Sequence, residues 1–421
     1  MLITMLTAGT RGDVQPYIAL GVALQAAGHY TVRIAASLSF ENLVTEYGLD
    51  FYPLPGDLSQ IALDSRVRKA MQADNPLKII MSFNRLKSLV FDLQKDFYRA
   101  CQGSDAIIYH PGAAIGYFIA AAFNIPSILA SPFPMTPTGD YPALIFYNFP
   151  RGGKSLNRLT HHIFEQIMWG MSRSHIKAFW QQEFGMAPPH FANPFKKQQT
   201  LQHPTIVSCS NYIFPKPQDW PEQVHNTGYW FLDKADHWQP PRELQDFLQN
   251  GPAPVYVGFG SLGDPTQSEQ TTQLVIDALS RSRQRGILAT GWNGMTRLAS
   301  IPENVFMLDS VPHAWLFPQM SAVVHHGGAG TTAAALRAGV PSVVIPHAND
   351  QFAWGSRVYS LGVGAVPIPR KKLTAEKLST AITSVLRAEV REAAKALGEK
   401  ILFEHGASRA AKIIIHCLQQ W

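Results

Sequence analysis

The run His325-His326-Gly327-Gly328-Ala329-Gly330-Thr331-Thr332 joins residue types that can bind a diphosphate. It follows an apolar stretch and precedes an alanine-rich one, so we expect it to link a buried strand to a helix. A helix start presents unpaired N–H groups and a partial positive charge, and glycines let phosphate oxygens approach them closely. His326 can donate to a phosphate oxygen, and Thr331 and Thr332 can add hydroxyl donors. The run predicts an anion-binding turn, although glycines also serve such turns for backbone reasons alone.

Two common nucleotide-binding motifs do not describe this run. Its glycines lack the Gly-x-Gly-x-x-Gly order of dinucleotide-binding folds, and no suitably placed acidic residue follows a second strand. The run contains no lysine, so it is not a P-loop either. The predicted ligand is therefore a diphosphate held in some other way.

The elements that position this run follow the rhythm of two parallel sheets with crossover helices. Short apolar runs at 2–6, 31–35, 51–54, 106–109 and 127–130 alternate with helical patterns at 15–27 and 112–123. The rhythm restarts with apolar runs at 255–258, 286–290, 305–308, 322–325 and 342–345 and a helical pattern at 268–281. We predict two doubly wound α/β domains of Rossmann type.

Proline content marks the expected boundary between these domains. Residues 215–254 are polar and aromatic and contain several prolines, which is typical of a linker. We assign residues 1–215 to the first domain, 216–253 to an interdomain linker and 254–400 to the second domain. The last segment, 401–421, is amphipathic and could cross back onto the first domain.

An aromatic segment in the first half fits neither rhythm. Residues 133–200 are rich in proline and aromatic side chains, which either pack as an extra helical layer or line an apolar pocket. Packing is the default role for any one aromatic residue, but the cluster favours an apolar acceptor. The candidates for acceptor contact are Phe133, Tyr141, Phe146 and Trp169.

Composition narrows the partners and the compartment. The net charge of +6 comes from 36 basic and 30 acidic residues without an arginine-rich block, so we expect no nucleic acid partner. A mildly basic surface is compatible with peripheral membrane contact or simply with a solvated surface. Three distant cysteines form no metal-spaced pair, and no signal peptide or membrane span is recognisable. We expect a cytoplasmic protein, peripheral to a membrane at most.

The run from Ser310 to Gln351 resembles the nucleotide-sugar signature of family 1 glycosyltransferases, which include sterol glucosyltransferases and antibiotic glycosyltransferases. The matching pieces are Val311-Pro312-His313, His325 to Thr332, Leu336-Arg337-Ala338-Gly339-Val340-Pro341, Asp350-Gln351 and, near the start, Gly9-Thr10-Arg11-Gly12-Asp13-Val14-Gln15-Pro16. The resemblance covers nearly the whole chain. It implies the GT-B fold, in which the two domains face each other across a cleft.

The resemblance also implies a set of donor-binding residues. Val311 and His313 would flank the nucleoside, and Asp350 with Gln351 would hold sugar hydroxyls, which a carboxylate and an amide can orient. Asp350 could equally cap a helix. Ser261 and Trp292 follow two strands and would contact phosphate and base, or be ordinary turn residues. The diphosphate would lie on His326, Gly328, Gly330 and Thr331.

Asp13 is the candidate catalytic base, because it stands where plant-type relatives carry a histidine in Gly-His-x-x-Pro. A carboxylate near the acceptor can remove the hydroxyl proton, and its ordinary pKa of about 3.9 leaves it ionised at neutral pH. Asp13 could also cap a helix that starts at Val14. His110, after another strand, could assist Asp13 or satisfy a local hydrogen bond.

We therefore expect inverting transfer of a hexose, with glucose first, from a UDP-sugar to a hydroxyl of a small apolar acceptor such as a sterol. A polyketide, flavonoid or carotenoid acceptor is the alternative. No Asp-x-Asp follows a predicted strand, so we expect no metal and no other cofactor. A nucleotide-sugar epimerase and a non-catalytic nucleotide-sugar binding protein are the rival functions.

Overall fold

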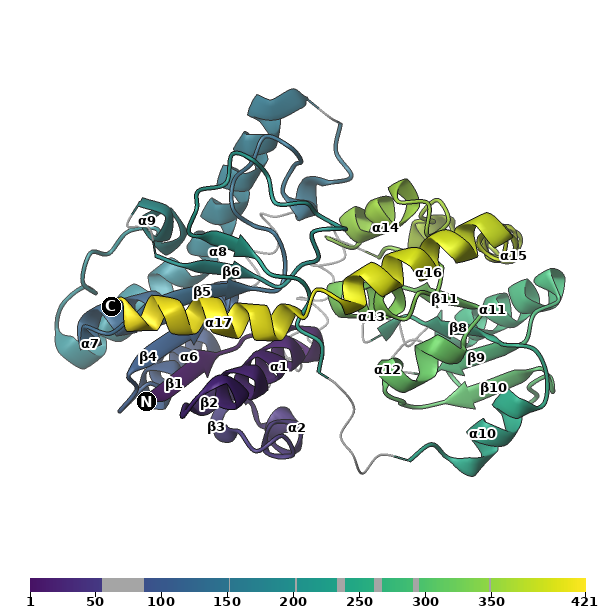
Figure 1. Cartoon of the computed structure of the whole chain (residues 1–421), viewed down its shortest axis with the longest axis horizontal. Helices are drawn as coiled ribbons and strands as arrows, with labels where there is room; N and C mark the ends of the chain where they lie inside the picture. Colours follow the sequence, from purple (N-terminus) through teal and green to yellow (C-terminus); the bar gives the residue numbers. More distant parts are fainter. Residues whose placement is uncertain are drawn as a thin grey trace. The chain divides into compact units, whose positions relative to one another are not determined.

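The computed structural model divides the chain into two compact units, residues Met1–Leu232 with Glu404–Trp421 and residues Asp233–Phe403. It describes residues 1–54, 87–150, 152–200, 203–232, 239–260, 267–290, 295–347 and 350–421. Each unit has a parallel sheet with helices (Figure 1). The prediction of two parallel α/β domains is confirmed.

The first unit contains, in its described part, a sheet of seven parallel strands in the order β3-β2-β1-β4-β5-β6-β7. The strands are β1 (Leu2–Leu6), β2 (Thr31–Ser37), β3 (Asp50–Leu54), β4 (Ala106–Tyr109), β5 (Ser127–Ser131), β6 (Thr205–Val207) and β7 (Val224–Asn226). The helices are α1 (Arg11–Ala27), α2 (Glu41–Thr45), α6 (Lys87–Ala100), α7 (Ile115–Phe123), α8 (Gly153–Phe184), α9 (Pro194–Thr200) and α17 (Gly406–Gln419).

The second unit contains, among its described residues, five parallel strands in the order β10-β9-β8-β11-β12. The strands are β8 (Val255–Gly258), β9 (Gly286–Ala289), β10 (Val305–Leu308), β11 (Ala322–His325) and β12 (Ser342–Val344). The helices are α10 (Arg242–Gln249), α11 (Ser268–Ser282), α12 (His313–Leu316), α13 (Ala329–Arg337), α14 (Gln351–Ser360), α15 (Ala375–Val385) and α16 (Ala388–Leu402). Both strand orders reverse beside the first strand of the unit, which is the doubly wound topology.

The expected linker at 216–253 is wrong over its first part. β7 pairs with β6 at the edge of the first sheet, and the first unit continues to Leu232 rather than ending at 215. Trp230 is buried against Tyr17 of α1, with ring centroids 6.0 Å apart, and its indole N–H donates to Thr227. The prolines of this region therefore interrupt a stretch that still belongs to a folded sheet.

The last helix, α17, belongs to the first unit. Figure 1 shows it (yellow) alongside α1 (purple), and the two helices are in contact. Ala410, Ala411 and Ile414 of α17 are fully buried in the same hydrophobic core as Tyr17 and Leu20 of α1. The helix that carries Asp13 near its start is thus covered by the C-terminal segment of the chain.

The aromatic segment forms an extra helical layer, with the 32-residue helix α8 at its centre. Trp169 stacks on Phe118 of α7 at 5.7 Å and meets Phe191 edge-on at 5.3 Å. Both helices contribute to one core on this face of the sheet.

Among the described residues, no helix combines the length and apolar composition that crossing a bilayer requires.

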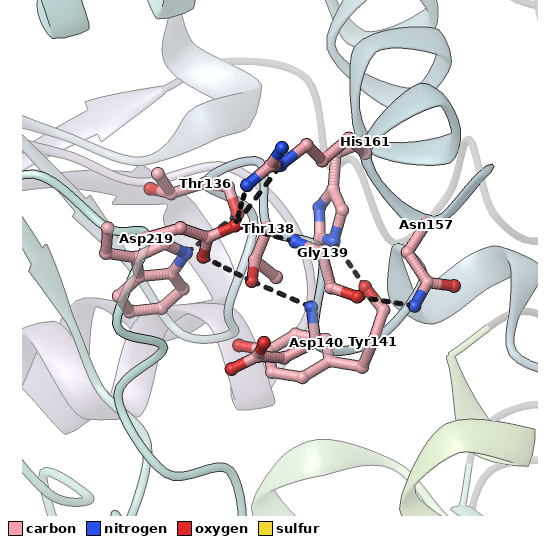
Figure 2. Close-up of polar contacts among 10 residues, drawn as sticks. Thr136, Thr138, Gly139, Asp140, Tyr141, Asn157, His161 and Asp219 are labelled. Carbon is pink, nitrogen blue, oxygen red and sulfur yellow. Dashed lines mark hydrogen bonds and ion pairs between the residues drawn. The ribbon is translucent and has the colours of Figure 1, made fainter. Parts of the chain in front are cut away.

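The loop after β5 is held by a dense polar network, drawn in Figure 2. The Asp219 carboxylate accepts hydrogen bonds from the Thr138 hydroxyl (2.6 Å) and the Gly139 N–H (2.8 Å). It also accepts two from the Arg158 guanidinium of α8, at 3.2 and 2.9 Å. Asn157 donates to the Gly139 carbonyl at 2.8 Å. One carboxylate therefore fastens this loop to α8.

The network lowers the pKa of Asp219. Burial by itself would raise the pKa of Asp219, but the hydrogen bonds from Thr138, Gly139 and Arg158 outweigh it and lower the pKa to about 2. A carboxylate with a lowered pKa stabilises the folded state above its unfolded pKa of about 3.9, and the contribution disappears as the pH falls toward 2.

We predict that Asp219→Asn lowers the free energy of unfolding of the first unit by about 2 kcal/mol at pH 7, because charged hydrogen bonds are lost. The difference from the parent should shrink as the pH falls below about 4. Urea unfolding followed by tryptophan fluorescence measures both effects. Asp246→Asn, which changes an exposed carboxylate of α10, is the control and should unfold like the parent. An Asp219→Asn difference that does not depend on pH would contradict this account.

Candidate active site

The glycine-rich run lies where the sequence predicted it, between β11 and α13. α13 begins at Ala329 with Gly328 as its N-cap, so the N–H groups of its first turn have no partner within the helix. Gly327 has φ +90°, a left-handed conformation that favours glycine. Its position leaves no room for a side chain, since a Cβ there would lie 2.7 Å from Val344 Cγ1. The turn thus presents bare backbone at a helix N-terminus.

His326 fits beside two glycines. A Cβ on Gly328 would lie 2.5 Å from His326 Nε2, and a Cβ on Gly260 would lie 3.0 Å from His326 Cε1. Burial lowers the pKa of His326 to about 4, so the imidazole is neutral at physiological pH. Its Nδ1 is buried without a hydrogen-bond partner among the described residues. The ring therefore has an unused hydrogen-bonding position next to the glycine-rich turn.

Two other polar residues of the run, His325 and Thr332, serve the turn itself. His325 is fully buried, and its Nδ1 accepts the Gly327 N–H at 3.1 Å. Burial, with smaller contributions from His326 and His313, lowers the pKa of His325 to about 3. The Thr332 hydroxyl donates to the Gly328 carbonyl at 2.9 Å. The expectation that Thr332 adds a donor for the ligand is therefore wrong, because α13 turns this side chain inward.

A pocket of about 120 Å³ in the second unit collects four of the predicted donor residues. These four are Val311, His313, His326 and Thr331. The carboxyl ends of β8, β10 and β11 contribute because parallel strands end at the same edge of a sheet. The remaining lining residues are Tyr256, Gly258, Gly260, Ala289, Leu308, Asp309 and Ser310.

His313 is held by aromatic contacts on two sides. Its ring stacks on Phe317 with centroids 4.2 Å apart and an interplanar angle of 14°. Tyr256 approaches its edge at 5.8 Å, and the Tyr256 hydroxyl lies 3.5 Å from His313 Nε2. Tyr256 and Gly260 were not among the predicted site residues. The only sequence signal that could have indicated them is that Tyr256 lies in β8 and Gly260 follows the carboxyl end of that strand.

Asp350 and Gln351 do not line this pocket. Asp350 is the N-cap residue of α14, and its carboxylate accepts the Trp354 indole N–H at 2.9 Å. Gln351 is buried, and its side-chain oxygen accepts the His347 N–H at 2.7 Å. A Cβ on Gly327 would lie 3.0 Å from the Gln351 carbonyl, so this turn adjoins the glycine-rich one. Ser261 and Trp292 lie outside the described residues.

Asp13 lies inside the first turn of α1, not at the N-cap position that the sequence suggested. α1 begins at Arg11 rather than near Val14, and Thr10 rather than Asp13 is its N-cap. The Asp13 carboxylate reaches back through Oδ2, which accepts the Thr10 N–H at 2.8 Å and the Thr10 hydroxyl at 3.1 Å. Gly9, at φ +136°, has no side chain and makes room for it, because a Cβ there would lie 2.2 Å from Oδ2. Oδ2 is thereby occupied, and Oδ1 faces a different neighbour.

That neighbour is His110, at the end of β4. His110 Nε2 lies 3.7 Å from Asp13 Oδ1, beyond a direct hydrogen bond. The Gly112 N–H donates to His110 Nδ1 at 2.9 Å, so Nδ1 is an acceptor and the proton of the neutral ring sits on Nε2. Burial lowers the pKa of His110 to about 3, which keeps the ring neutral. His110 thus presents an N–H toward Asp13 and cannot itself act as a base at physiological pH.

Asp13 itself is well matched to proton abstraction. Burial raises the pKa of Asp13 to about 6, although the hydrogen bonds from Thr10 lower it. The side chain keeps 30% of its surface exposed, so a hydroxyl can reach it. A base whose pKa lies just below the working pH is mostly ionised and still accepts a proton readily.

The four candidate acceptor residues separate into two kinds. Tyr141 and Trp169 are buried, with Tyr141 packed on Phe214 and Trp169 on Phe118. Phe133 and Phe146 are half-buried and pack against the same core as α8. Packing therefore accounts for the contacts of the first two, whereas the second pair retains exposed surface for a ligand.

Two family models match this chain. Residues 3–142 match the glycosyltransferase family 28 N-terminal domain, and residues 273–416 match the Erythromycin biosynthesis protein CIII-like C-terminal domain. The solved glycotransferase of kitacinnamycin has the same fold, with a TM-score of 0.73, 21% identity and 99% of each chain covered. The calicheamicin glycosyltransferase CalG4 gives a TM-score of 0.66 at 18% identity, covering 100% of this chain and 98% of the other. The chain carries both domains of a GT-B glycosyltransferase.

Curated relatives match the two glycosyltransferase domains together. A sterol 3-beta-glucosyltransferase of Arabidopsis thaliana is 36% identical over 418 residues, which is 97% of this chain and 66% of the relative. A sterol 3-beta-glucosyltransferase of Emericella nidulans is 37% identical over 435 residues, 99% of this chain and 30% of the relative. The chain therefore spans about two thirds of the plant protein and less than a third of the fungal one.

We predict that Gly328→Ala weakens UDP binding by about tenfold or more, because the new methyl group displaces the His326 ring. Isothermal titration calorimetry with UDP measures the change. Gly170→Ala, whose Cβ would meet nothing within 4 Å, is the matched control and should bind UDP like the parent.

A double-mutant cycle separates this effect from a general disturbance of the turn. In a His326→Ala background, which itself should bind UDP more weakly, Gly328→Ala should cost little more. An undiminished effect of Gly328→Ala in that background would show that the glycine acts independently of His326.

Proposed function

We propose that the chain transfers glucose from UDP-glucose to a hydroxyl of a sterol, with inversion at the anomeric carbon and without a metal ion. The observation that carries the proposal is the pocket of the second unit, where His326, Thr331 and the start of α13 lie beside Val311 and His313. The 36% identity to a sterol 3-beta-glucosyltransferase favours a sterol over a polyketide, flavonoid or carotenoid acceptor.

The donor would bind through chemistry that the second unit offers. The diphosphate would accept hydrogen bonds from the first-turn N–H groups of α13, from the Thr331 hydroxyl and from His326. The uracil edge would meet the Val311 backbone beside the aromatic pair His313 and Phe317. Asp350 and Gln351, in the adjoining turn, would contact the glucose hydroxyls.

The first unit would supply the base. Asp13 Oδ1 would take the proton of the acceptor hydroxyl as the oxygen bonds to the anomeric carbon and the bond from that carbon to the diphosphate breaks. One direct displacement of this kind turns an α-linked donor into a β-glycoside. The Thr10 hydrogen bonds would hold Oδ2, and the N–H of His110 would face Oδ1 across 3.7 Å.

The leaving group develops negative charge on the diphosphate, which the α13 N-terminus can stabilise. Its N–H groups are already oriented in the folded protein, so no reorganisation is needed during the reaction. A neutral His326 adds one N–H donor, and the approach of the diphosphate favours its protonation. These groups would do the work that Mg²⁺ does in many other nucleotide-sugar enzymes.

Incubation with UDP-glucose and a panel of hydroxylated apolar compounds tests the function. We expect a sterol glucoside by mass spectrometry, a β-anomeric coupling in its NMR spectrum and the same rate in EDTA. Activity that EDTA abolishes would refute metal independence, and an α-glucoside would refute inversion. An altered nucleotide sugar without acceptor would indicate an epimerase, and UDP-glucose binding without turnover would indicate a binding protein.

We predict that Asp13→Asn lowers kcat by about a hundredfold or more, because the base is lost while the amide can still accept from Thr10. Asp277→Asn, an exposed change on α11, should keep the parent rate. In the parent, kcat/KM should fall as the pH drops through about 6, where Asp13 becomes protonated.

The Thr10→Ala variant distinguishes a catalytic role of Asp13 from a purely structural one. Loss of the Thr10 hydroxyl removes a hydrogen bond that lowers the pKa of Asp13, so the acid limb of the kcat/KM profile should move to higher pH. An acid limb that stays in place in Thr10→Ala would contradict the assignment of Asp13 as the base.

A further inference from the structure

Helix α8 carries an apolar stripe on its exposed side. Leu156, Leu159 and Ile163 keep 42%, 50% and 40% of their surface exposed. They are spaced three and seven residues apart, so they share one face of the helix. Phe149, four residues before the helix, is 55% exposed. Figure 1 shows the N-terminal part of α8 extending past the sheet of the first unit, at the top of the view.

This stripe is distinct from the face that packs on the core. Phe164, Trp169, Ile176 and Phe179 of α8 are buried in the core of the first unit. A surface helix normally has one apolar stripe, directed at the core, and a polar opposite face. Leu156, Leu159 and Ile163 form a second stripe on the opposite side, which the described residues of the unit leave exposed. Contiguous exposed apolar surface of this kind marks an interaction site.

Most of the exposed charged residues of α8 are basic. Lys154, Arg158, Arg173 and Lys177 are exposed, and Arg158 pairs with Asp219. The two acidic residues of α8 are withdrawn from this surface, since Glu165 is buried and Glu183, in the last turn, pairs with Lys95. Lys177 lies 18 residues, five helical turns, beyond Leu159 and therefore on the same face. The stripe is continued by cations.

We infer that the exposed face of α8 docks on an anionic lipid bilayer. Leu156, Leu159 and Ile163 would enter the boundary between headgroups and acyl chains, and Arg173 and Lys177 would meet anionic headgroups. A helix with apolar residues and Lys or Arg on one side is suited to lie in this interface. The inference does not require the proposed reaction, because it concerns binding of the chain to lipid.

Charge favours a bilayer over a second copy of the chain as the occupant. A two-fold contact places the same surface on both partners, so Arg173 and Lys177 would face their own counterparts. Like charges in such a contact are unfavourable. An anionic membrane instead complements them, and it attracts basic segments within a Debye length of its surface. The charges therefore select the lipid surface.

Vesicle flotation of the full chain tests the inference in the absence of UDP-glucose. The parent should float with vesicles of phosphatidylcholine mixed with phosphatidylserine, and binding should weaken with added salt. The double variant Leu159→Ser with Ile163→Ser should lower vesicle affinity by about tenfold or more, since two apolar anchors are lost. Arg173→Gln with Lys177→Gln should lower affinity for the mixed vesicles but not for phosphatidylcholine alone.

Leu402→Ser is the matched control, because Leu402 of α16 is exposed to 48%, as Leu159 is to 50%, and lies in the second unit. It should float like the parent. Unchanged flotation of the Leu159 and Ile163 variant would overturn the inference. The inference would also be overturned if the parent sedimented as a dimer that this variant dissociates, while the flotation of the variant stayed the same as that of the parent. Turnover of a detergent-solubilised acceptor by the variant is measured separately. It shows whether the proposed reaction fails independently of vesicle binding.

Discussion

The glycines beside His326 are the constraint on which the donor side depends. The imidazole occupies space that is open only because Gly260 and Gly328 have no Cβ, and the same Gly328 caps α13. One backbone arrangement therefore both exposes the helix N-terminus and places a neutral histidine next to it. The glycines of the run are required for the position of a side chain as well as for the approach of a ligand.

Burial acts in opposite directions on the two kinds of titratable group at the candidate sites. It lowers the pKa of His326 and His110, which stay neutral, and raises the pKa of Asp13 toward neutrality. Hydrogen bonds then refine the result, since Thr10 holds back the rise at Asp13. Each group is thereby left in a state that suits its proposed task, with N–H donors at the histidines and a proton acceptor at the carboxylate.

Much of the fold could be predicted because buried parallel strands are short, uninterrupted apolar runs. β1, β4, β8, β10 and β11 begin and end at the predicted residues. β6 and β7, of three residues each, were missed, and β7 lies among prolines that are typical of a linker. Convergence of Val311, His313, His326 and Thr331 followed from strand ends meeting at one edge.

Other features of the sites depend on contacts between distant segments. The proximity of Tyr256 to His313 arises only when residues far apart in the chain pack together, and the same packing sets the 3.7 Å between His110 and Asp13, whose association the sequence had suggested. The inward turn of Thr332 and the early start of α1 depend on local hydrogen bonds that residue types alone do not determine. The aromatic segment shows the same limit, since its composition did not distinguish buried Trp169 from half-buried Phe133.

The packing of α17 on α1 has a consequence for how the protein is made. The first unit is discontinuous, and the residues that complete its core are synthesised after the whole of the second unit. While only the first sheet has been synthesised, the side of α1 that α17 covers is still exposed. The second unit is contiguous in the chain and can complete its core earlier. The unit that begins synthesis first is therefore the last to finish folding.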